Sequence, residues 1–426
     1  MHLNLLVQLR DHLRSCSFLD CWKQLQVEVE EEVDAFLEWK SALANQTHSL
    51  LPSWKKNSTN NTISPCKWLG ITCNIEGSIA ELNVSGLGLQ GTLLSFNFSS
   101  FSNFVRLDFS MSKLNGVIPS QIGNLLKLAY LDFYMNEISE HIPPEIGFLT
   151  SLRMLDFSEN QFTGSIPQEV GNLHFLTDLN LYANNFTGSI PTSLCNLSNL
   201  NGLYLHVNQP SGPIPQDIGQ LKSLTILALY TNNFTGSIPA SLTNLTSLKT
   251  LYLHENKFSG SIPREIGRLS SLTGLALYKN NLTCSIPVSI TNLTSMAVLY
   301  LYQNQLSGAI PREIGRLRSL TNFELCTNYL TDSIPDSLTN LTRLAILHLF
   351  KNQLFGNIPQ NVGRLKSLTI LNLSTNNHNG SIYASLTNLS SLDTLCLGAN
   401  QLSGTIPRDI GRLTALTIFC YSLFWY

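Results

Sequence analysis

The chain has 426 residues, of which 43% are hydrophobic and 13% are charged, and its formal net charge is −2. This balance excludes the concentrated basic face that nucleic-acid binding requires. The length suits two or three globular domains, or one repeat array without internal boundaries.

Residues 1–29 form an atypical leader. Their short apolar run is interrupted by Asn4 and Gln8 and is followed by charged residues, so it lacks the pattern of a signal peptide. We therefore expect poor export of the chain as written.

Residues 30–77 have a different composition, which we interpret as the N-terminal cap of a repeat array. The stretch EVDAFLEWKSAL has the apolar spacing of an amphipathic helix, and Trp39, Trp54 and Trp68 follow one another closely. Cys66 and Cys73 in SPCKWLGITC are close enough to form a small disulfide loop. The other cysteines show no such framework.

Residues 78–415 repeat every 24 residues with the pattern LxxLxLxxNxLxGxIP, giving about fourteen coils. This period predicts an α/β leucine-rich repeat solenoid with one short parallel strand per coil, centred near Leu131, Leu155, Leu179 and onward. A carboxamide donates and accepts hydrogen bonds at once, so the recurring asparagine can pair backbone groups of neighbouring coils. This structural asparagine ladder comprises Asn136, Asn160, Asn184, Asn208, Asn232, Asn256, Asn280, Asn304, Asn328, Asn352, Asn376 and Asn400.

A double period of 48 residues lies over the single one. Glycosylation signals and arginines alternate between coils, the arginines being Arg268, Arg316, Arg364 and Arg412. The candidate glycosylation sites are Asn185, Asn196, Asn233, Asn244, Asn281, Asn292, Asn340 and Asn388. The array therefore resembles the product of duplicating pairs of coils.

Two departures predict local weakness in the thirteenth coil. His378 stands where other coils bury leucine or phenylalanine, and Tyr383 stands where they have proline. The tail, residues 416–426, diverges from the repeat, and we expect no cysteine pair to cap it.

Aromatic residues form stripes between the strand leucines. Because side chains alternate faces along a strand, residues between inward leucines face outward. The predicted ligand-binding residues on this concave face are Tyr182, Tyr204, His206, Tyr230, Tyr252, His254, Tyr278, Tyr300 and Tyr302. An alternative is that duplication copied a ladder of stacked rings with no ligand. Histidines near their usual pKa of ~6.5 would make affinity vary with pH in an acidic wall.

Catalytic and metal sites are not indicated. HExxH is absent, and His206 and His254 lie two coils apart, too far to share a metal. Asp132 and Asp156 face the same way, but an open sheet rarely supplies the pocket that a carboxylate enzyme needs. The kinase motifs HRD and DFG and an apolar stretch of membrane-spanning length are also absent from the sequence. We expect no enzyme activity and no cofactor.

The segment EVDAFLEWKSAL…SW…PCKWLGITC and the repeat LxGxIPxxIGxLxxL resemble the extracellular domains of plant leucine-rich-repeat receptor-like kinases, of the MIK-like subfamily XII type, over residues 30 to 415. The resemblance implies a right-handed superhelix at the cell surface. Its concave sheet face would bind a secreted peptide or protein, and a co-receptor ectodomain would dock near the C-terminal coils.

From Asn136 onward, no arginine occupies the outward strand positions. Receptors of this family commonly hold a peptide's free carboxylate with an arginine pair there, so we expect recognition through backbone and internal side chains. The alternative function is that of a soluble wall protein resembling the polygalacturonase-inhibiting proteins, which share the repeat but are shorter.

Overall fold

The computed structural model describes residues 18–56 and 65–420. They form two compact units, which divide the chain after Asn185. The expectations for the first 17 residues of the leader and for 421–426 in the tail lie outside the described residues. We call residues up to 185 the first unit and those from 186 the second unit.

The first unit begins with the cap. Its helix α2 (Phe18–Ala42) is followed by the short 3-10 helices η1 (Asn45–Leu50) and η2 (Pro65–Lys67) and by strand β1 (Ile71–Cys73). Cys66 and Cys73 form a disulfide with their Cα atoms 5.4 Å apart. This short loop holds η2 against β1.

Three tryptophans attach the cap to the coils. Trp39 and Trp54 are fully buried, and the stacked rings of Trp54 and Trp68 have centroids 5.9 Å apart. The Trp39 indole Nε1 donates to the carbonyl of Thr92 at 2.9 Å, which joins α2 to the first coil. Burial of these large rings covers the end of the repeat core, and the indole N–H groups of Trp39 and Trp54 are both paired with backbone carbonyls.

Each coil contributes one strand to a main sheet whose core side is lined by leucine. In the first unit, β1 pairs antiparallel with β2, and the later strands pair in parallel so that Leu131 lies beside Leu155 and Leu155 beside Leu179. These leucines are fully buried. The strand centres predicted from the period are confirmed. The strands are β2 (Ile79–Asn83), β4 (Arg106–Asp108), β6 (Tyr130–Asp132), β8 (Met154–Asp156) and β10 (Asp178–Asn180).

Within the second unit the strands pair in the same way. Each strand is paired in parallel with the strand 24 residues away. Leucine lies beside leucine in most pairs, as in Leu227 beside Leu251, and Phe323 and Phe419 take the leucine position in two of the strands. The strands are β12 (Gly202–Tyr204), β14 (Ile226–Ala228), β16 (Thr250–Tyr252), β18 (Gly274–Ala276), β20 (Val298–Tyr300), β22 (Asn322–Glu324), β24 (Ile346–His348), β26 (Ile370–Asn372), β28 (Thr394–Cys396) and β30 (Ile418–Cys420).

A second layer of short strands follows the turns after the main strands in each unit. In the first unit it contains β3 (Gln90–Thr92), β5 (Lys113–Gly116), β7 (Glu137–Glu140) and β9 (Gln161–Ser165), and β11 (Asn185–Thr187) lies at the boundary. In the second unit it contains β13 (Ser211–Gly212), β15 (Asn233–Phe234), β17 (Ser259–Ser261), β19 (Asn281–Thr283), β21 (Ser307–Gly308), β23 (Tyr329–Leu330), β25 (Phe355–Gly356), β27 (Asn377–Ser381) and β29 (Gln401–Ser403).

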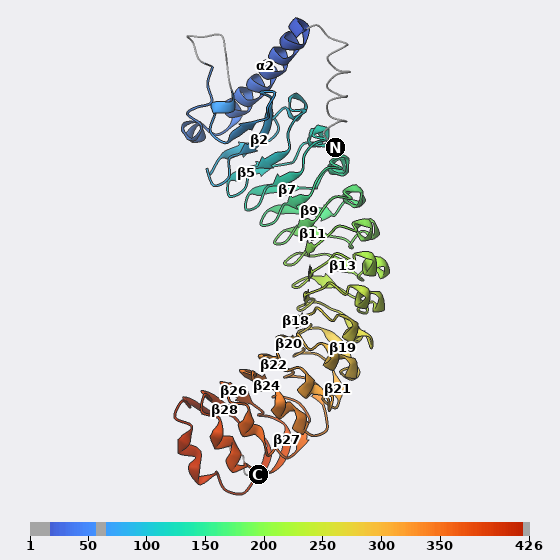
Figure 1. The fold of residues 1–426 in the computed structure, drawn as a ribbon, viewed down its shortest axis with the longest axis vertical. Coiled ribbons are helices and arrows are strands. Elements are labelled where there is room, and N and C mark those ends of the chain that lie inside the picture. The colour runs from blue at the N-terminus through green and yellow to red at the C-terminus, as the bar shows by residue number, and fades with distance from the viewer. Residues whose placement is uncertain (1–17, 57–64, 421–426) are drawn as a thin grey trace. The chain divides into compact units, whose positions relative to one another are not determined.

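Short 3-10 helices, and no α-helices, complete the described coils on the side away from the main sheet (Figure 1). Proline is the N-cap residue of most of them, in the extended backbone that its fixed φ permits. They are η3 (Phe98–Ser100), η4 (Ser120–Asn124), η5 (Pro144–Phe148), η6 (Gln168–Asn172), η7 (Thr192–Asn196), η8 (Gln216–Gln220), η9 (Ala240–Asn244), η10 (Ile266–Arg268), η11 (Val288–Asn292), η12 (Ile314–Arg316), η13 (Asp336–Asn340), η14 (Val362–Arg364), η15 (Ala384–Asn388) and η16 (Arg408–Arg412). The described residues thus form a leucine-rich repeat solenoid, and the predicted fold class is confirmed.

The recurring asparagine joins neighbouring coils. Asn256 Nδ2 donates to the carbonyl of Leu229 at 2.9 Å and to that of Leu253 at 3.2 Å. Its Oδ1 accepts from the backbone N–H of Phe234 in the preceding coil at 3.0 Å. One buried side chain thereby satisfies backbone groups that would otherwise lack partners.

One rung of this ladder is incomplete. The residue that should donate to Asn232 Oδ1 is Pro210, which has no backbone N–H. Asn232 Oδ1 is buried without a partner, although its Nδ2 still donates to Leu205 and Leu229. The proline therefore leaves one acceptor unpaired in the second unit.

Backbone strain recurs before each ladder asparagine. The preceding residue is left-handed, as in Glu255 and Lys279 with φ of 54° and 50°. Three further residues, Glu140, Cys284 and Asp332, have φ of 66°, 66° and 72° at the turn where most coils use glycine. Side chains other than glycine rarely adopt this region, so these turns are strained.

The backbone of the thirteenth coil shows no local decay, but the weakness predicted at His378 is present in its side chain. Strand β27 is regular, and the N–H of His378 donates to Asn400 Oδ1 at 3.1 Å, as in the other coils. His378 is fully buried, and its Nδ1 lies 3.3 Å from the carbonyl of Gly356. Its Nε2 is nevertheless buried without a partner. The neighbouring coils keep the backbone of this coil regular, so the substitution lowers stability through the unpaired ring nitrogen.

The expectation that no cysteine pair follows the repeats is also wrong. Cys396 and Cys420 are partners in the register of β28 and β30, and they form a disulfide with Cα atoms 4.3 Å apart. Their separation of 24 residues equals one repeat, which places both at the same position of neighbouring coils. Cys195 and Cys326 are buried free thiols, and Cys284 is an exposed one.

Candidate functional site: the aromatic face of the main sheet

The predicted binding residues all lie on the outward face of the main sheet, and all nine are half-buried. Tyr182 belongs to the first unit and the other eight to the second. In the second unit they follow β12 to β20, because the residues between and after the paired leucines point away from the core. We call the eight residues from Tyr204 to Tyr302 the aromatic strip.

The first row of the strip is a continuous stack of rings. His206 and Tyr230 have centroids 4.2 Å apart, Tyr230 and His254 are 4.4 Å apart, and Tyr278 lies 4.3 Å from both His254 and Tyr302. The interplanar angles lie between 9° and 21°. Parallel strands place equivalent side chains side by side, so their faces cover one another. The rings present their edges outward.

The second row contains Tyr204, Tyr252 and Tyr300, one in every second coil. Tyr252 is edge-on to Tyr230 and His254, with centroid distances of 6.5 and 5.9 Å. A Cβ added to Gly274 would lie 3.2 Å from Tyr252 Oη, so that ring leans over the glycine of the next strand. Small residues between the tyrosines give each ring room to lie across the sheet. The two rows thus form one aromatic surface.

Polar groups border this surface. Glu255 accepts hydrogen bonds from Lys279 Nζ at 2.6 Å and from Thr231 Oγ1 at 2.9 Å. Asn322 Nδ2 donates to Tyr300 Oη at 3.2 Å. Burial raises the pKa values of Tyr278, Tyr300 and Tyr302, so these phenols stay neutral and can donate hydrogen bonds.

The expected histidine titration is wrong. Burial lowers the pKa of both His206 and His254 from 6.5 to about 4. For His254, the attraction of Glu255 raises the pKa only in part, and the positive charge of Lys279 lowers it further. The sequence indicates that the rings can stack, but it does not show how much water the stacked neighbours exclude from the histidines. Both rings are therefore neutral at mildly acidic pH.

In the first unit, Asp132 and Asp156 lie on the outward face of the main sheet, and their carboxylates are hydrogen-bonded to nearby residues. Asp132 accepts from Tyr130 Oη and from the N–H of Tyr134, both at 2.8 Å. Asp156 accepts from Asn180 Nδ2 at 2.7 Å. Burial raises the pKa of Asp132 to about 6. These carboxylates accept hydrogen bonds from the turn after each strand and so stabilise it.

Among residues 18–56 and 65–420, no group of three or more His, Cys, Asp or Glu side chains is placed to hold a metal ion. Tyr230 lies between His206 and His254 in the stack. Of the candidate glycosylation asparagines, Asn233 is half-buried and the other seven are exposed. Glycosylation at these positions stays a prediction.

Family models match two parts of the chain. The leucine-rich repeat N-terminal domain matches residues 29–74, and the leucine-rich repeat region matches 160–259 and 240–354. A probable leucine-rich repeat receptor-like protein kinase of Arabidopsis thaliana is 46% identical over 94 residues, which are 22% of this chain and 8% of that protein. MDIS1-interacting receptor like kinase 2 of the same plant is 42% identical over 99 residues, 23% of this chain and 9% of that protein. The alignments thus cover a small part of these relatives.

Solved structures agree with these matches. The chain is 32% identical to a TDR receptor, with a TM-score of 0.73 over 80% of this chain and 63% of the receptor chain. It is 29% identical to the plant peptide hormone receptor RGFR1 in complex with RGF2, with a TM-score of 0.62 over 84% of this chain and 68% of that one. In the described part, no helix combines the length and apolarity that a membrane crossing needs. The chain belongs to the leucine-rich repeat proteins, and it is similar to the ectodomains of plant receptor-like kinases.

Proposed function

We propose that the chain is the ligand-binding region of a plant receptor-like kinase and that it binds a secreted, extended peptide on the aromatic strip. The observation that carries this proposal is the continuous stack from His206 to Tyr302, half-exposed along neighbouring strands. Tyrosine is favoured at binding surfaces because it offers rigid apolar area and a hydroxyl group. The likeness to a peptide hormone receptor supports this class of ligand.

The mode of binding follows from the groups that border the strip. A peptide lying across the strands would place side chains against the ring edges of both rows and its backbone near the Tyr252 and Tyr300 hydroxyls. Glu255 is already paired with Lys279. With no arginine in these outward positions, binding depends on internal side chains and backbone, so an amidated C-terminus is tolerated. Signalling at the cell surface with a co-receptor belongs to the same proposal.

The test uses a displayed library of random linear peptides, selected on the wild-type chain produced with an added signal peptide. Selected peptides are then measured against the double variant Tyr230→Ala and Tyr252→Ala. Ser374 and Gly398 hold the position of Tyr230 in later coils, so the fold tolerates a small residue there. We expect at least a tenfold loss of affinity, since a buried aromatic anchor contributes ~1–2 kcal/mol or more.

The matched control carries Arg268→Ala and Arg316→Ala on the 3-10 helices η10 and η12. Both arginines are exposed and lie on the opposite side of their coils. We expect this variant to bind the selected peptides as the wild type does. Loss of affinity confined to the arginine variant would place the site on the wrong side of the sheet and refute the proposal.

The neutral histidines predict how binding depends on pH. Because His206 and His254 have pKa values of about 4, neither ring gains a proton between about pH 7 and pH 5. Affinity for an uncharged selected peptide is therefore expected to stay constant over that range. A titration of affinity with a midpoint near 6, abolished by His254→Phe, would contradict it.

A further inference from the structure

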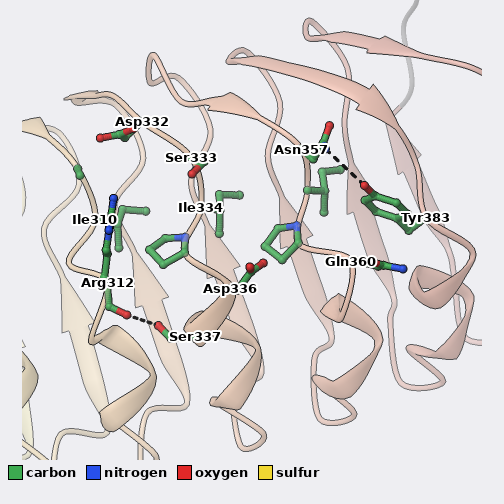
Figure 2. A pocket seen from close by; sticks show the side chains of 14 residues that line it. Ile310, Arg312, Asp332, Ser333, Ile334, Asp336, Ser337, Asn357, Gln360 and Tyr383 are labelled. Atoms are coloured by element: carbon green, nitrogen blue, oxygen red, sulfur yellow. Dashed lines mark hydrogen bonds between the residues drawn. The ribbon is translucent and has the colours of Figure 1, made fainter.

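The second unit has a hollow of about 660 Å³ on the side of its coils, away from the aromatic strip. The loops that join β21, β23 and β25 to the following 3-10 helices form it, and Figure 2 shows their side chains around it. Its floor consists of the buried side chains Ile310, Ile334 and Ile358. Its volume is within the ~300–1,000 Å³ of small-molecule sites.

The hollow lies where the repeat departs from its own pattern. Asp332 replaces the turn glycine and holds a left-handed φ of 72°. Asn357 replaces the serine of neighbouring coils, and Tyr383 replaces the proline before a 3-10 helix. Asn357 Nδ2 donates to Tyr383 Oη at 3.4 Å (Figure 2). Three departures in consecutive coils meet at one hollow, and strain retained at such a position is typical of function.

The lining favours a neutral ligand with many hydroxyl groups. Arg312, Asp332 and Asp336 are exposed at the rim, so the carboxylates outnumber the cation and disfavour a phosphate or another acid. Carboxylate, guanidinium and amide groups accept from or donate to pairs of neighbouring hydroxyls. An aromatic ring such as Tyr383 packs against the C–H face of a pyranose. These chemical requirements are met together by a sugar.

We propose that this hollow binds a neutral pyranose oligosaccharide, with the ring of Tyr383 against a sugar face and with Asp332, Asp336 and Asn357 hydrogen-bonded to its hydroxyl groups. Two sources share this chemistry. One is the chain's own N-glycan, since Asn340 and Asn388 are exposed at the ends of η13 and η15, whose first residue and N-cap residue, Asp336 and Tyr383, line the hollow. The other is a free oligosaccharide. The site does not depend on peptide binding by the aromatic strip.

The experiment measures binding of cellohexaose, mannopentaose and hexagalacturonate to the secreted chain by calorimetry, before and after enzymatic removal of N-glycans. We expect at least one neutral probe to bind and the acidic hexamer to bind more weakly. Neutral binding that appears only after glycan removal assigns the chain's own N-glycan to the hollow. Equal neutral binding before and after removal assigns a free oligosaccharide.

Two variants restore the usual residue of the repeat, so each is expected to fold. Asp332→Gly and Tyr383→Pro place the usual residues of the repeat at those positions, and each is expected to weaken neutral binding at least tenfold. Cys284→Gly is the matched control, because it makes the same change at the same turn position outside the lining. It should bind as the wild type does, and all three variants should keep the wild-type response to displayed peptides.

The proposal fails if neither neutral probe binds in either preparation, or if hexagalacturonate binds more tightly than both neutral probes. It also fails if Asp332→Gly and Tyr383→Pro bind the neutral probe as tightly as Cys284→Gly does. Thermal unfolding of each preparation verifies that the compared proteins are folded.

Discussion

Replacing Asn256 with alanine is expected to destabilise the second unit by about 3 kcal/mol, and replacing Asn232 by clearly less. In both variants the lost Nδ2 group donated to carbonyls that also accept from a second asparagine. The Leu229 carbonyl, for example, accepts from both Asn232 and Asn256, so it keeps one donor in either variant. Only Asn256→Ala also leaves a buried N–H, that of Phe234, without its acceptor. An unpaired buried group costs ~1–3 kcal/mol, which sets the expected difference between the two variants.

Guanidinium unfolding followed by circular dichroism measures this difference. Repeat arrays can unfold in parts, so amide hydrogen exchange around Phe234 supplies a local measurement alongside the global one. Asn232→Ala is the matched control, because Pro210 has already removed the corresponding N–H. Equal destabilisation by the two variants would contradict this prediction, because it would show that the hydrogen bond from the Phe234 N–H to Asn256 Oδ1 does not contribute to stability.

His378→Leu is expected to stabilise the chain by about 1–2 kcal/mol. The substitution removes a buried Nε2 without a partner, worth ~1–3 kcal/mol, and loses the weaker Nδ1 contact with Gly356. Leu354 occupies the same position one coil earlier and is fully buried, so the cavity accepts leucine. Leu354→His is the reverse control and should destabilise. A neutral or harmful His378→Leu would show that an ordered group satisfies the ring.

The gain from His378→Leu should increase in acid. Burial lowers the pKa of His378 below its ordinary 6.5, so the folded ring stays neutral where the unfolded ring binds a proton. The unfolded state therefore binds more protons below pH 6.5, and stability is lost as pH falls through that value. His206 and His254 act in the same direction down to about pH 4. Unfolding at about pH 7 and pH 5 measures the change.

The sequence predicts the fold well because a fixed period constrains every coil alike. Leucines at 24-residue steps place Leu131, Leu155 and Leu179 in one row, and one carboxamide per coil joins them. Cys66 and Cys73 lie within one short loop, so their pairing needs no long-range information. Local spacing carries these features, and the structure contains them as predicted.

Other features depend on contacts between coils. Cys396 and Cys420 are separated by 24 residues, which is one repeat. This spacing predicts their pairing only if the tail is counted as a further coil. The pKa values of His206 and His254 depend on water excluded by stacked neighbours, which spacing does not measure. The sequence placed Tyr383 at a weak point, whereas in the structure its ring forms one wall of a hollow.

The stacked row from His206 to Tyr302 also has an optical consequence. Tyr278 and Tyr302 lie with centroids 4.3 Å apart and planes 9° from parallel, close enough for their ring transitions to couple. Coupled chromophores give a near-ultraviolet circular dichroism contribution in addition to that of each separate tyrosine. Opening one coil would interrupt the row and remove that signal while the backbone of distant coils stays ordered. The chain thus carries an intrinsic spectroscopic reporter, placed on the surface proposed to meet the ligand.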